Sequence, residues 1–126
     1  MNIIGETELI LTEKKKIYHL NLSKEEIAND IILVGDPERV NLISSKFDEI
    51  NYKIQHREFI THTGVLNRKP ISVISTGIGT DNIDIVINEL DALVNINFDN
   101  RTVNPTKKSL NLIRLGTSGA LQKNID

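Results

Sequence analysis

The stretch that most limits how this chain can fold is residues 31–39, which read IILVGDPER. Its first four residues are apolar with no polar alternation, which is typical of a strand covered on both faces of an α/β sheet. Gly35 then permits a sharp turn, Asp36 can accept the free N–H groups of a following helix, and Pro37 suits a first helical position. The sequence therefore predicts a buried strand that turns directly into a helix beginning at about Pro37.

The start of this helix is a candidate anion site. A helix N-terminus has unpaired N–H donors and a partial positive charge. Arg39 adds a planar guanidinium in the first turn, which can bind two oxygen atoms at once. The alternative is a capped turn with a solvated arginine, and the motif alone leaves both interpretations open.

Composition excludes several classes of protein. The chain of 126 residues has the length of a single domain, residues 1–126, and its sequence shows no internal domain boundary. A net charge of -2 and the lack of a basic face interleaved with aromatics argue against nucleic-acid binding. The sequence has no cysteine for thiolate metal sites, and its three histidines have no metal-ligand spacing. With no signal pattern and no membrane-length apolar run, we expect a soluble cytoplasmic protein without membrane partners.

The first part of the chain carries few signals. Residues 1–16 mix apolar and charged residues without a period, so we expect an N-terminal arm with at most one short strand. Ser23 and Glu26 have the spacing of a capping box, which predicts a short helix from Lys24. His19 lies just before it and could be a packed, solvated or functional histidine.

The middle of the chain predicts a hairpin. The helix after Pro37 is expected to end near residues 46–47. Residues 52–66 have an extended pattern, and a turn at residues 67–70 leads into residues 71–75, so these two runs should pair antiparallel. The predicted fold class is therefore α/β, with a mixed central sheet flanked by helices.

Two segments in this region are ambiguous. HREF at residues 56–59 is either an exposed, salt-bridged strand face or part of a site. The small-residue turn after residue 75 leads into a helix whose apolar face is expected to comprise Ile83, Val86, Ile87, Leu90 and Val94. Gly77 and Gly79 resemble a dinucleotide fingerprint only weakly, because Asn82 stands where a third glycine is required.

The last third of the chain completes the predicted site. Residues 95–108 are expected to form a loop, and residues 110–115 a third apolar strand followed by Gly-Thr-Ser-Gly. An arginine in a buried strand is costly unless paired, so Arg114 should face a carboxylate, a carbonyl or an anionic ligand. Because the carboxyl ends of neighbouring parallel strands gather at one edge, the loops at Gly35, Gly77 and Gly116 should converge on one crevice.

These motifs together resemble the nucleoside phosphorylase family of the uridine phosphorylase and hexameric purine nucleoside phosphorylase type, and its uridine branch most. Five segments match in order: IYHLNL at residues 17–22, GDPER at 35–39, HREF at 56–59, STGIG at 75–79 and RLGTSGALQ at 114–122. The resemblance implies that phosphate attacks the anomeric carbon of a nucleoside, giving free base and ribose 1-phosphate. It implies no cofactor other than phosphate as co-substrate.

The resemblance also implies roles for individual residues. Within one subunit, phosphate would be bound by Gly35, Arg39, Arg114 and Thr117. Of these four residues, Arg39, Arg114 and Thr117 would be catalytic. A neighbouring subunit would contribute Arg57 to this phosphate and His19 to the 5′ end of the sugar, so we expect a homo-oligomer, at least a dimer and a hexamer at full length. Ser118 and Gly119 would border the base.

Two departures from the family remain. Some members hold a monovalent cation at the subunit interface with a glutamate and a turn that correspond to Glu58 and residues 78–82. In this chain the turn has larger residues than in those members. No other metal is expected. Family chains are also about twice as long, so we expect the amino-terminal half of a phosphorylase, inactive by itself. The alternatives are a purine nucleoside phosphorylase, a nucleosidase of the same fold, and a catalytically silent fragment that binds anions or dimerises.

Overall fold

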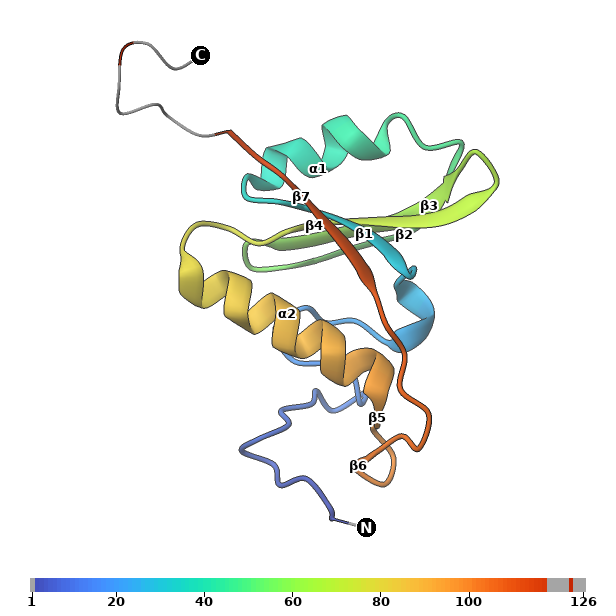
Figure 1. Ribbon diagram of the computed structural model, residues 1–126, viewed down its shortest axis with the longest axis vertical. Coiled ribbons are helices and arrows are strands. Elements are labelled where there is room, and N and C mark those ends of the chain that lie inside the picture. Colours follow the sequence, from blue (N-terminus) through green and yellow to red (C-terminus); the bar gives the residue numbers. More distant parts are fainter. Residues whose placement is uncertain (1, 118–122, 124–126) are drawn as a thin grey trace.

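The computed structural model describes residues 2–117 and 123, and one mixed sheet lies at its centre (Figure 1). Its strand order is β2-β3-β4-β1-β7. The strands are β1 (Asp30–Val34), β2 (Glu49–His56), β3 (Phe59–Leu66), β4 (Lys69–Ser75) and β7 (Asn111–Leu115). β1 is parallel to β4 and β7, whereas β3 is antiparallel to both β2 and β4. The prediction of a mixed α/β sheet is confirmed.

Two helices cover the two faces of this sheet (Figure 1). On one face, α1 (Pro37–Ser44) packs through Val40 in a cluster with Val34. On the other, α2 (Thr80–Asn95) packs its buried residues in a second cluster with Ile31 and Leu33. Successive residues of β1 therefore point into different cores, which confirms that this apolar run is covered on both faces.

The turn from β1 into α1 forms as predicted. Asp36 accepts a hydrogen bond from the backbone N–H of Glu38 at 2.9 Å, and Pro37 is the first helical residue. The helix ends at Ser44, slightly before the predicted position. The reason is that the N–H groups of Lys46 and Phe47 bond three residues back instead of four, so the chain tightens into turns.

The predicted hairpin is in fact two hairpins. The extended run at residues 52–66 is broken by a turn at Arg57, which adopts a φ of 55°, between β2 and β3. The predicted turn at residues 67–70 is shorter, because only Asn67 and Arg68 have left-handed φ, 52° and 67°, while the next two residues already pair in β4.

Two helical predictions also need correction. The apolar face of α2 differs from the predicted one: Val86, Leu90 and Leu93 are its buried residues, while Ile87 is 43% exposed. Ile85 and Ala92, which lie outside the predicted face, also pack against this core, so periodicity alone does not single out the inward face. The helix expected at Lys24 is one 3₁₀ turn, η1 (Lys24–Glu26).

The N-terminal arm and the segment predicted as a loop support each other. Residues 96–103 contain a small hairpin of β5 (Ile96–Asn97) and β6 (Thr102–Val103), so the prediction of a plain loop is wrong there. Arg101, in its turn, donates hydrogen bonds to the carbonyl oxygens of Ile4, Gly5 and Leu9. The arm is thereby tied to the body of the protein, and its Leu9 is buried.

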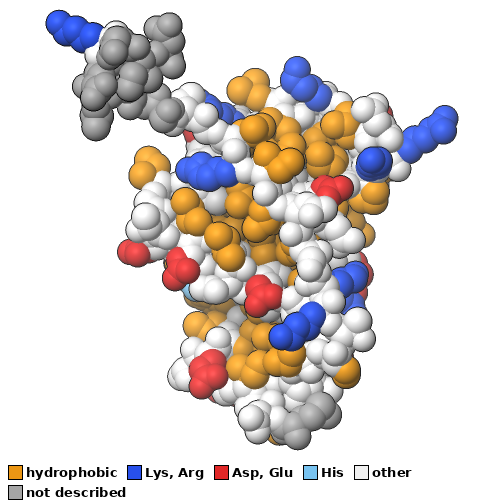
Figure 2. Space-filling model, viewed as in Figure 1, with side chains coloured by type: hydrophobic (Ala, Val, Ile, Leu, Met, Phe, Trp, Pro, Cys, Tyr) orange, Lys and Arg blue, Asp and Glu red, His pale blue; other side chains and the backbone are white. Residues whose placement is uncertain are grey.

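The edge strand β7 contradicts the expectation of a buried third strand. All five of its residues are exposed, including Leu112 at 38%, Ile113 at 61% and Leu115 at 46%. Hydrophobic side chains gather on the face that β7 crosses (Figure 2).

In the part of the chain that the structure describes, no helix is long and apolar enough to span a membrane.

A buried histidine links α1 to the sheet and is expected to make the stability of the fold depend on pH. Ser44 Oγ lies 2.7 Å from His62 Nδ1, and His62 as a whole is 8% exposed. Burial, and then the charge of Lys53, lower the pKa of His62 below its ordinary value of 6.5. A lowered histidine pKa means that folding favours the neutral ring, so this contribution to stability is complete above pH 6.5 and is lost as the pH falls towards the lowered pKa.

We therefore expect the free energy of unfolding to decrease between about pH 7.5 and 5.5, with a slope of at most about 1.4 kcal/mol per pH unit from this residue. Urea unfolding at a series of pH values measures it. His62→Gln should remove this part of the slope. An unchanged slope in the variant would show that other groups cause the pH dependence.

Candidate functional site at the carboxyl edge of the sheet

The carboxyl ends of the three parallel strands form one edge of the sheet. Val34 of β1 is in register with Ser75 of β4 and with Leu115 of β7, so the loops after them begin side by side. The N–H of Gly77 donates to the carbonyl oxygen of Gly35 at 3.0 Å and holds two of these loops together. The structure thus brings the predicted glycine loops to one place.

A hollow of about 720 Å³ opens at this edge. It is lined by Gly35, Asp36, Pro37, Glu58, Gly77, Ile78, Gly79, Asn82 and Arg114. The lining therefore includes two of the residues predicted to bind phosphate, and Glu58 with part of the turn expected to hold a cation.

Arg114 lies directly over the glycine backbones of this edge. A Cβ atom built on Gly35 would be 3.7 Å from its Nη2 atom, and one built on Gly116 would be 3.3 Å from its Nη1 atom. The contact at Gly35 is an ordinary van der Waals distance, whereas at Gly116 a side chain would require a small shift of the guanidinium. Because β7 is exposed, the expected cost of burying Arg114 does not arise, and within residues 2–117 it forms no ion pair.

Arg39 and Thr117, the other predicted phosphate ligands, do not line the hollow in the described structure. Arg39 belongs to α1, which packs on one face of the sheet, whereas Arg114 is paired with Leu33, whose side chain points to the α2 face. An anion shared by both arginines would therefore have to lie above the edge, where the two layers end.

The start of α1 offers fewer free donors than the sequence predicts. The N–H groups of Glu38 and Arg39 both bond to Asp36, to its side chain and its carbonyl oxygen respectively, and Pro37 has no N–H. What remains for an anion at this helix end is mainly the helix dipole. Among the described residues that line the hollow, Arg114 is consequently the one that carries a positive charge.

The hollow also contains two carboxylates against this one guanidinium. Asp36 Oδ1 accepts the N–H of Glu38 at 2.9 Å, and Glu58 Oε1 accepts from Asn82 Nδ2 at 3.2 Å. These bonds use one oxygen of each carboxylate and do not cancel its charge. A strongly bound dianion would need a further cation from outside these residues.

The elements expected to hold a monovalent cation do come together. Gly77 has a φ of 74°, and a Cβ there would meet Asn82 Nδ2 at 2.7 Å and Glu58 Cγ at 2.8 Å. Glycine is thus required at residue 77 both by its backbone conformation and by the close approach of Glu58. The carboxylate of Glu58 and the turn at residues 78–82 share one corner of the site.

Arg57 and His19 are placed together, outside the lining of the hollow. Arg57 is exposed in the turn between β2 and β3. The preceding residue, His56, makes a 2.8 Å hydrogen bond through its Nδ1 to the carbonyl oxygen of His19. Both residues predicted to act in a neighbouring subunit therefore lie in one region. Ser118 and Gly119, predicted to border the base, lie outside the described residues.

Sequence reasoning missed one residue of this region, Glu89. Its carboxylate lies on α2 and contacts the ring and backbone of His19. The sequence gives no signal for this pair, because 70 residues separate the two and Glu89 looks like an ordinary polar residue of an amphipathic helix.

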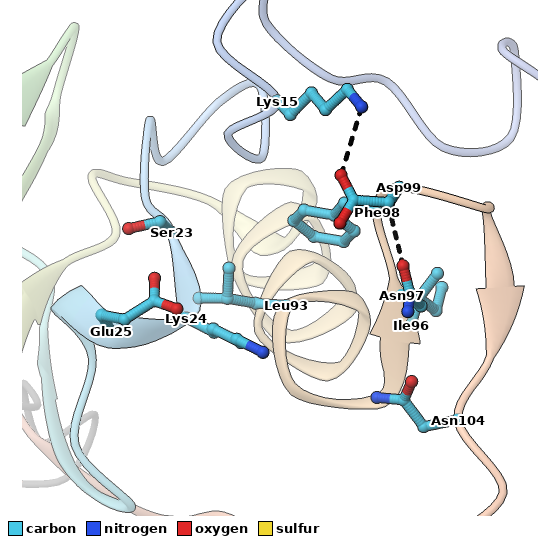
Figure 3. A pocket seen from close by; sticks show the side chains of 10 residues that line it. All are labelled: Lys15, Ser23, Lys24, Glu25, Leu93, Ile96, Asn97, Phe98, Asp99 and Asn104. Carbon is cyan, nitrogen blue, oxygen red and sulfur yellow. Dashed lines mark hydrogen bonds and ion pairs between the residues drawn. The ribbon is translucent and has the colours of Figure 1, made fainter.

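A second hollow, of about 220 Å³, lies beside the β5–β6 hairpin (Figure 3). It contains an ion pair between Lys15 and Asp99 at 3.1 Å. None of the predicted site residues lines it. In the described part of the chain, no group of three histidine or carboxylate side chains could hold a metal ion.

Comparisons with known proteins agree on one family. The model described as "Phosphorylase superfamily" matches residues 29–126. Uridine phosphorylase of Thermococcus kodakarensis is 40% identical over 115 residues, 91% of this chain and 36% of the relative. That of Escherichia coli is 35% identical over 115 residues, 90% and 40% of the two chains. A crystal structure of a Trypanosoma brucei nucleoside phosphorylase, which shows uridine phosphorylase activity, superimposes with a TM-score of 0.85 at 34% identity, covering 94% of this chain and 41% of that one. The chain thus spans well under half the length of these proteins.

Proposed function

The chain belongs to the phosphorylase superfamily, and we propose that it forms the phosphate-binding part of a nucleoside phosphorylase that cleaves uridine to uracil and ribose 1-phosphate. The observation that carries the proposal is the guanidinium of Arg114 held over Gly35 and Gly116 at the hollow. The similarity to enzymes named for uridine favours that substrate.

In this proposal, phosphate lies above the carboxyl edge, where Arg114 orients it and Arg39 and Thr117 reach it from the ends of their elements. The close glycine backbones let the anion approach the main chain. As the bond from sugar to base breaks, the sugar develops positive charge, and the bound phosphate is both nucleophile and counter-charge. No cofactor other than phosphate is needed for this chemistry.

The excess of carboxylates in the hollow supports a contribution from a second copy of the chain. Arg57 is exposed in a turn and is free to reach across a subunit boundary, where its charge would offset Asp36 and Glu58. We therefore propose a homo-oligomer, either a dimer or a hexamer built from three dimers, in which His19 also reaches the neighbouring sugar. A monovalent cation at Glu58 is part of the same proposal.

Phosphate binding tests this proposal. We expect Arg114→Gln to weaken phosphate binding roughly ten- to a hundred-fold, because it removes a charge-assisted hydrogen bond of about 1.5–3 kcal/mol. Arg57→Gln should weaken binding only at protein concentrations where the chain associates. Arg68→Gln is the matched control, since Arg68 has a similar left-handed φ in the other hairpin turn. Calorimetric titration with phosphate, at constant ionic strength, gives each affinity, and sedimentation gives the oligomeric state.

Two results would contradict the proposal. Equal phosphate affinity of the Arg114→Gln variant and the unmodified chain would remove its central residue. Equal loss in the Arg57→Gln and Arg68→Gln variants would show a general effect of net charge, so that Arg57 has no specific role.

A further inference from the structure

The carboxylate of Glu89 makes three hydrogen bonds to residues 19 and 20, which follow the N-terminal arm. Its Oε2 atom accepts from the backbone N–H of His19 at 3.2 Å and lies 2.7 Å from the ring Nδ1 of the same residue. Its Oε1 atom accepts from the backbone N–H of Leu20 at 3.0 Å. The contact is partly shielded from water, since the side chains of His19 and Glu89 are 25% and 12% exposed.

His19 is also held from the opposite side. His56, at the end of β2, makes a 2.8 Å hydrogen bond to the His19 carbonyl oxygen through Nδ1. The His19 ring meets the rings of Tyr18 and Phe59 edge to face, at centroid distances of 5.1 and 6.4 Å. The backbone and the ring of this residue are thus both fixed, by groups from α2 and from the β2–β3 hairpin.

This geometry determines where the ring proton lies. An ionised carboxylate only accepts hydrogen bonds, so the His19 nitrogen 2.7 Å from Glu89 must carry a hydrogen. In a neutral imidazole the other nitrogen is then an acceptor. If Glu89 served only to hold the backbone of residues 19 and 20, its bonds to their two N–H groups would be sufficient. The additional bond to Nδ1 also fixes the orientation of the His19 side chain.

We propose that Glu89 is a positioning residue: it holds His19 as the Nδ1–H tautomer, so that Nε2 presents a hydrogen-bond acceptor to a substrate hydroxyl group. The identity of that hydroxyl, at the 5′ end of a nucleoside, rests on the proposed function, whereas the tautomer does not. The expected ligand chemistry is a neutral hydroxyl donor.

Nitrogen NMR of the histidine rings tests this inference on the 126-residue chain. Long-range ¹H–¹⁵N spectra are recorded at alkaline pH, where histidine rings are neutral. We expect His19 to show the shifts of a protonated Nδ1 and an unprotonated Nε2. Glu89→Ala should convert His19 to a mixture of tautomers. The matched control is Asp91→Ala, which removes another carboxylate of α2, one that bonds only to Asn95 among the described residues.

Each outcome is decisive. A proton on Nε2 of His19 in the unmodified chain would overturn the inference without any variant, so a poorly folded Glu89→Ala protein does not prevent the test. An unchanged His19 tautomer in a folded Glu89→Ala variant would also overturn it. Because no spectrum involves phosphate, failure here is distinct from failure of the phosphate-binding proposal.

Discussion

Replacing Gly64 with alanine is expected to lower the free energy of unfolding by about 3 kcal/mol or more. A Cβ atom at residue 64 would lie 1.9 Å from the carbonyl oxygen of Glu49, and 3.0 Å from the Cα of Ile50. These are backbone atoms of the neighbouring strand β2, which cannot rotate away as a side chain could. The variant must separate β2 from β3 or fail to fold.

The reason for this close approach is an irregularity in the sheet. The register between β2 and β3 shifts between Ile50 and Tyr52, so that Asn51 has no partner across the pair. Such a bulge bends its strand and brings the backbone towards the residue opposite. Glycine at residue 64 accommodates the bend, and any larger residue there would oppose it.

Urea unfolding of the variant and the unmodified chain measures this effect. Gly5→Ala is the matched control, because no atom lies within 4 Å of a Cβ built there, and its stability should change by no more than about 0.5 kcal/mol. A Gly64→Ala protein as stable as the Gly5→Ala control would show that β2 does not lie against β3 in this register.

The connection from β1 to α1 is predictable from sequence because its signals are local. An unbroken apolar run, a glycine, a capping Asp36 and Pro37 each act over a few residues and agree with one another. The turn between β2 and β3 is not predictable in this way. Arg57 adopts a left-handed φ of 55° without being glycine, asparagine or aspartate, so only the pairing of the two strands shows it.

The candidate site likewise has parts that are predictable from sequence and parts that are not. The meeting of Gly35, Gly77 and Arg114 follows from a topological rule, since the carboxyl ends of neighbouring parallel strands share an edge. The direction of Arg39 follows no such rule, because it depends on how α1 is rotated on the sheet. The contact between Glu89 and His19 depends on the whole path of the chain. The apolar pattern of β7 indicates that another protein surface should pack on this strand, but it does not identify that surface.

The second large effect concerns activity: the 126-residue chain should bind phosphate yet release essentially no uracil from uridine. Cleavage requires the sugar and the phosphate to be held in line, and that orientation supplies a large part of the rate enhancement. In the proposed function, Arg114 is the group at the hollow that would bind phosphate. The two carboxylates that could bind sugar hydroxyls, Asp36 and Glu58, already accept from Glu38 and Asn82. Within the described residues, the lining therefore offers no carboxylate with both oxygens free to bind two hydroxyls of the ribose.

The assay supplies uridine and phosphate and follows uracil by ultraviolet absorbance. We expect a rate at least about a thousand-fold below an ordinary turnover of roughly 1 per second. A full-length uridine phosphorylase under the same conditions controls for the assay, and phosphate binding by the chain controls for its folding. Release of uracil near the ordinary rate would show that the groups at this edge are sufficient for catalysis, and that the roles assigned to Asp36 and Glu58 are wrong.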